Sequence, residues 1–114
     1  MPDEFKIYFN KRKQWLKVFL WDVHPTTFSN WNQTRWGYFL ATWQNPKVGE
    51  FGEVHFVKGK LPNHEDTVAH EMFHAVCEWM WANRTALTYN NEERMAMLLD
   101  RLVGSFYREY RKLK

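Results

Sequence analysis

The sequence predicts an α+β fold in which a small, mainly antiparallel sheet from the N-terminal half packs on two long C-terminal helices. Short stretches rich in aromatic and β-branched residues, typical of strands, recur up to residue 57. Beyond residue 63, apolar residues recur at helical spacing in two longer stretches. The chain has 114 residues, a length that favours one domain, so we expect residues 1–114 to share a single core.

Two hairpins are expected in the N-terminal half. The first joins residues 5–9 to residues 15–23, and His24-Pro25 ends it because proline donates nothing to a ladder and restricts the residue before it. The second joins residues 36–43 to residues 53–57 through a turn-like segment. The polar stretch between the hairpins, residues 26–35, suits either a short helix or a loop.

The first predicted helix begins near Asn63, which can cap it, with Asp66 placed for a capping box, and it ends near Asn83. Its apolar residues lie on two sides of a helical wheel, so we expect burial on both: Ala69, Phe73, Val76 and Met80 against Val68, Met72 and Trp79. A cleft is expected along the polar gap between them, at Thr67, Glu71 and Glu78.

A second helix is predicted from about Glu92 to Arg111. Its apolar positions form one stripe that can face the core: Met95, Leu98, Leu99, Leu102, Phe106 and Tyr110.

Charge and cysteine content indicate which partners and which compartment to expect. The net charge is +3, with basic clusters near both ends. Most such clusters are only solvated surface charge. Nucleic acid is therefore a possible partner but not the expected one. The single cysteine, Cys77, excludes an internal disulfide and fits a reducing compartment. No stretch suggests a signal or membrane span, and we expect a cytoplasmic protein without membrane association.

The first helix contains His70-Glu71-Met72-Phe73-His74, the HExxH pattern. Four residues advance a helix by about 400° and about 6 Å, so the two histidines lie one turn apart on one face and can hold one metal ion. Glu71 lies about 100° round the helix, where a carboxylate can accept a proton from water at the metal. The competing interpretation is a core helix whose histidines are satisfied by other partners.

A hydrolytic zinc site usually takes three protein ligands and leaves one position open. Glu78 continues the series of His70 and His74 but lies about 12 Å along the axis from His70, too far to share an ion. The acidic pair Glu92-Glu93, at the start of the next helix, follows at a workable distance.

These segments resemble the gluzincin class of zinc peptidases and, more closely, small phage and prophage proteins with a minimal gluzincin-like (zincin) domain. The resemblance covers about residues 52–110 and is carried by Thr67 to Ala75 and Asn91 to Ala96. It implies His70 and His74 as zinc (Zn²⁺) ligands, Glu71 as the general base and Glu93 as the third ligand. The chain departs from larger gluzincins at Met97, where they place an aspartate.

The second helix offers some basis for choosing between the two glutamates. Glu93 shares a face with Ala96, Met97 and Asp100, where a small residue permits close approach and Asp100 can replace the missing aspartate or form a salt bridge instead. Glu92 shares a face with apolar residues and suits packing and the helix dipole. On the last strand, His55 is interpreted as a surface histidine, with a catalytic role as the alternative.

The expected function is zinc-dependent hydrolysis of peptide bonds in a protein or peptide substrate, that is, a metalloprotease, in the host cytoplasm if a phage encodes it. The alternative is a phage regulatory or assembly protein that keeps the zinc site for stability and binds a protein or nucleic-acid partner. Glu71 argues against this alternative, because a purely structural site needs no base beside an open position.

Overall fold

The computed structural model describes residues 2–9, 13–23, 25, 36–45, 48–58 and 65–113. The predicted cap Asn63 and the ambiguous stretch 26–35 lie outside these residues. Among the described residues, neither helix is long and apolar enough to cross a membrane.

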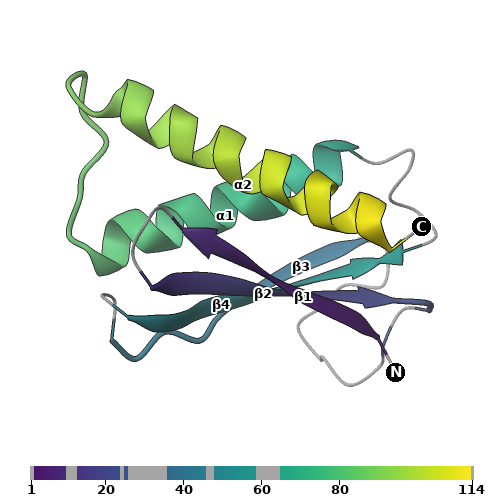
Figure 1. Ribbon diagram of the computed structural model, residues 1–114. Coiled ribbons are helices and arrows are strands. Elements are labelled where there is room, and N and C mark those ends of the chain that lie inside the picture. Colours follow the sequence, from purple (N-terminus) through teal and green to yellow (C-terminus); the bar gives the residue numbers. More distant parts are fainter. Residues whose placement is uncertain are drawn as a thin grey trace.

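The described residues form a four-stranded sheet with two helices on one face, which confirms the predicted α+β class (Figure 1). The strands are β1 (Asp3–Phe9), β2 (Gln14–Trp21), β3 (Gly37–Ala41) and β4 (Gly49–Val57). The helices are α1 (Glu65–Ala82) and α2 (Glu92–Lys112), which run antiparallel to each other across the sheet.

Both predicted hairpins are present. β1 pairs antiparallel with β2, and β3 pairs antiparallel with β4. The two hairpins meet through a parallel pairing of β2 with β4, which makes the sheet mixed, in the order β1-β2-β4-β3. Among the described strands, β3 therefore lies at one edge of the sheet, and α1 contacts this strand.

The core lies between the sheet and the helices. Alternate residues of β2, namely Leu16, Val18 and Leu20, are fully buried, as the period of two in a strand requires. From α2, the ring of Phe106 lies 5.2 Å from that of Phe56. Full burial of such a side chain contributes about 1.5–3 kcal/mol, so this aromatic cluster is a principal attachment of α2 to the sheet.

His55 is buried on the sheet face opposite the helices, at 1% exposure, so its interpretation as a surface histidine is wrong. The Trp21 Nε1–H donates to His55 Nδ1 at 3.0 Å, which leaves Nε2 as the protonated nitrogen that donates to Glu53 Oε1, also at 3.0 Å. Burial lowers the pKa of His55, although the Glu53 carboxylate opposes the shift. Its ring stacks on Phe19, so His55 serves the packing of this face.

Candidate metal centre

Helix α1 carries the HExxH residues near its middle. Its first turn holds Glu65 and Asp66, which suit the positive end of the helix dipole. The helix ends at Ala82, and Arg84, two residues later, has a φ of 53°, the left-handed conformation usual after a helix. The N–H of Thr85 returns to the carbonyl of Met80 at 2.7 Å and so satisfies one of the last carbonyls of the helix.

His70 and His74 are exposed, and their Nε2 atoms converge to 3.2 Å. Two nitrogens bound to tetrahedral zinc at about 2.0–2.1 Å lie roughly 3.3 Å apart, so this separation fits two ligands of one zinc ion. A hydrogen bond between two neutral imidazoles has a similar length, so the distance suits both interpretations of the pair. The rings are nearly perpendicular, at 78°.

Glu71 is buried at 5% exposure, beside the histidines but below the surface that they occupy. Its Oε2 lies 3.9 Å from His70 Nε2. A Cβ at Gly37 would come within 2.8 Å of Glu71 Cγ and 2.9 Å of Thr67 Cγ2, so only glycine lets β3 lie this close to the helix. The carboxylate is therefore held between α1 and the outer strand of the sheet.

The expected open cleft along the polar side of α1 is not what the described residues form. β3 covers that side at Glu71, and farther along the helix Trp43 Nε1 donates to Glu78 Oε1 at 2.8 Å. Phe73, expected to be buried, is 56% exposed instead. The polar side is thus a packed interface, and the exposed surface of the helix carries the histidines and Phe73.

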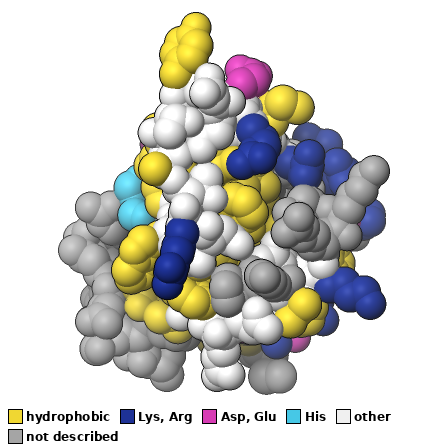
Figure 2. Space-filling model, turned by 90° about the vertical axis from the view of Figure 1, so that its left-hand side faces the viewer, with side chains coloured by type: hydrophobic (Ala, Val, Ile, Leu, Met, Phe, Trp, Pro, Cys, Tyr) yellow, Lys and Arg dark blue, Asp and Glu magenta, His cyan; other side chains and the backbone are white. Residues whose placement is uncertain are grey.

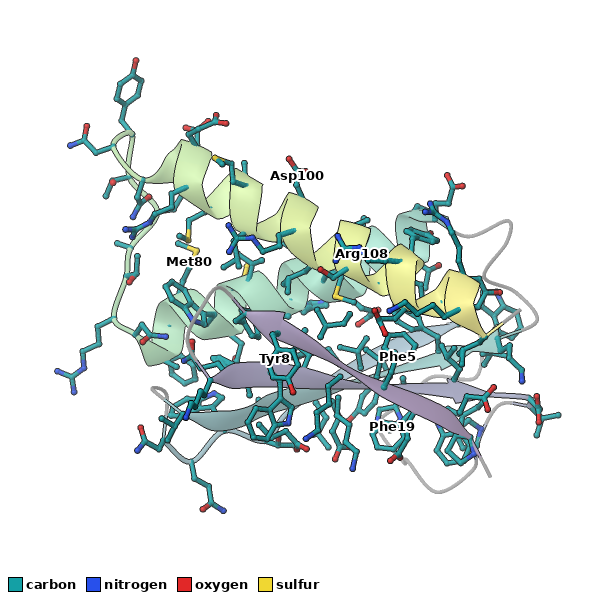
Figure 3. The ribbon with its side chains drawn as sticks, viewed as in Figure 1. Phe5, Tyr8, Phe19, Met80, Asp100 and Arg108 are labelled. Carbon is teal, nitrogen blue, oxygen red and sulfur yellow. The ribbon has the colours of Figure 1, made fainter. Side chains whose placement is uncertain are left out.

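The structure does not bring the predicted third ligand to the histidines. The described residues contain no group of three His, Cys, Asp or Glu side chains that could hold a metal ion. Met80, near the end of α1, lines the same groove as Glu92 and Met95, near the start of α2. The start of α2 is therefore opposite the end of α1. Met80 lies about 9 Å from His74 along the axis of α1. Glu93 is exposed there and stays a prediction as a ligand. Asp100 is exposed and points away from α1 (Figure 3).

An apolar groove of about 470 Å³ runs beside the histidines, between the second half of α1 and the start of α2. Hydrophobic side chains gather at this end of the molecule in Figure 2. Phe73 and Cys77 connect the groove to the histidine surface, and Glu92 is its charged member. Partial burial raises the pKa of the Cys77 thiol.

The chain has no significant match among protein-family models, curated proteins or solved structures.

The close approach at Gly37 generates a prediction about stability. Gly37→Ala should lower the free energy of unfolding by about 1–3 kcal/mol, because the added methyl group forces Glu71 or Thr67 to move. The matched control is Gly104→Ala, also a glycine-to-alanine change, at a helical site where a Cβ meets nothing within 4 Å. This control should gain about 0.5–1 kcal/mol. Urea unfolding of both variants measures the difference, and equal effects would contradict the tight contact.

Proposed function

We propose that this chain is a zinc-dependent peptidase that hydrolyses peptide bonds in a protein or peptide substrate. The observation that carries the proposal is the pair of converging histidine nitrogens, 3.2 Å apart, with a buried carboxylate 3.9 Å from one of them. A histidine pair alone suits many roles. A glutamate held beside it in a buried position suits proton transfer at a metal site.

The roles of the residues follow from their positions. His70 and His74 would hold the ion through Nε2. Bound zinc supplies a Lewis acid that acidifies water and polarises a carbonyl group. Glu71 accepts the proton of the attacking water at its carboxylate and delivers it to the departing amine. Its burial beneath β3 limits its rotamers and keeps the carboxylate near His70.

The outer strand suggests where an extended substrate lies. β3 pairs with β4 on one side, and no other described strand pairs with it on the other side. It passes Glu71 at Gly37, so a peptide aligned with β3 would run past this carboxylate. Main-chain pairing at a sheet edge accepts many sequences, which suits a protein or peptide substrate.

Glu71→Gln tests the proposed base. The amide keeps the size of the side chain but removes the basic oxygen, so hydrolysis of a quenched-fluorescent peptide library should fall by about 10²- to 10⁴-fold. Zinc content should stay unchanged. Glu78→Gln is the matched control, because it removes a carboxylate from the same helix, one that Trp43 binds, and should keep full activity. Equal activity of Glu71→Gln and the control would exclude Glu71 as the base.

We retain Glu93 as the proposed third ligand, with the first turn of α2 approaching His74 when zinc binds. The connection between the helices, residues 83–91, contains neither helix nor strand and is the segment that would have to adjust. Such a movement would narrow the apolar groove, because Glu92 and Met95 lie on its α2 side.

Three variants rank the possible third ligands. Glu93→Gln should weaken zinc affinity at least tenfold, as the loss of a charged ligand does, whereas Glu92→Gln should stay within a few-fold of the parent. His64→Ala is the third arm, since His64 directly precedes α1 in the sequence and lies outside the described residues. Competition with a chromophoric chelator measures the affinities. A greater loss in His64→Ala or Glu92→Gln than in Glu93→Gln would transfer the ligand role to that residue.

A further inference from the structure

A row of arginines lies along the exposed face of α2. Arg94, Arg101 and Arg108 are all exposed and follow one another at intervals of seven residues. Seven residues make nearly two helical turns, so the three side chains share one face, about 10.5 Å apart along the axis. The row spans about 21 Å. Figure 3 labels Arg108 on α2, and Lys and Arg side chains gather toward one side of the molecule in Figure 2.

The described part of the chain does not neutralise this row. No ion pair joins any of the three arginines to a described acid. Lys112 extends the row and is bound to Glu109 at 3.0 Å. Glu93 and Asp100 lie on a neighbouring face of α2, and none of the three arginines is three or four residues from either, the spacing at which helical side chains pair.

Gly104 lies in the middle of the same face, three residues after Arg101 and four before Arg108. Glycine in the interior of a helix lowers the stability of that helix. A Cβ at Gly104 would meet nothing within 4 Å, so packing inside the described structure does not require glycine there. A partner that comes close to the backbone would require it. The two arginines then lie one turn to either side of the point of closest approach.

We propose that this face of α2 binds the phosphate backbone of a nucleic acid duplex. The guanidinium group matches the geometry of phosphate and donates to two of its oxygens. A duplex carries a regular line of negative charge along a stiff rod, which matches a straight, rigid row of cations better than a flexible chain does. Because the arginines bind phosphate, binding is independent of base sequence and weakens steeply as salt increases.

The test is fluorescence anisotropy of a labelled 20-base-pair DNA duplex, titrated with the full chain over a series of salt concentrations. The triple variant Arg94→Gln, Arg101→Gln, Arg108→Gln should bind at least tenfold more weakly. The slope of log K against log salt should fall by about 0.9 for each phosphate that the variant no longer neutralises. The matched control is the triple variant Lys6→Gln, Lys13→Gln, Lys17→Gln, which removes the same charge from the sheet side of the molecule and should stay within threefold of the parent.

A second variant tests the close approach itself without changing charge. Gly104→Leu adds a helix-forming side chain in open space, so the protein should fold, yet duplex affinity should fall at least tenfold. Equal losses in the two triple variants would overturn the proposal, as would unchanged affinity in Gly104→Leu. Competition by poly-L-glutamate as strong as that by unlabelled duplex would also overturn it and indicate an acidic protein partner. These assays contain EDTA, so their outcome is independent of the proposed zinc chemistry.

Discussion

The contact between α1 and β3 at Gly37 is the constraint on which the candidate centre depends. It brings the outer strand of the sheet against Glu71 and buries the carboxylate. Burial of a carboxylate is costly unless the group is hydrogen-bonded or paired with an opposite charge. Here it leaves the histidines on the exposed face of the helix and the carboxylate beneath them. The chain thereby separates the groups that would hold an ion from the group that would move a proton.

Local sequence patterns predicted most of the elements. Both hairpins and both helices appear close to their expected residues, because strand composition and helical spacing are properties of short segments. The parallel pairing of β2 with β4 was not predicted, since it joins distant segments and no local signal specifies it. The burial of His55 was missed for a related reason: its partner Trp21 comes from a strand 34 residues earlier.

The sequence predicted the helix that carries the candidate site better than it predicted the residues packed around that helix. The HExxH spacing places two histidines on one face in any regular helix, and their nitrogens do converge. A helical wheel cannot tell which neighbour covers which face, so it assigned Phe73 to the core and an open cleft to the side that β3 covers. The pair Glu92-Glu93 was selected by distance along the chain, and Glu93 by the resemblance and by its helical face, whereas the distance of either from His74 depends on how the helix hairpin is aligned.

The most direct test of the account is a zinc titration of protein purified without chelators, with bound metal counted by mass spectrometry. The account predicts one zinc per chain, lost in both His70→Ala and His74→Ala and retained in Cys77→Ser, which alters the groove beside the histidines. A parent protein that takes up no zinc, or histidine variants that bind it as the parent does, would contradict the account.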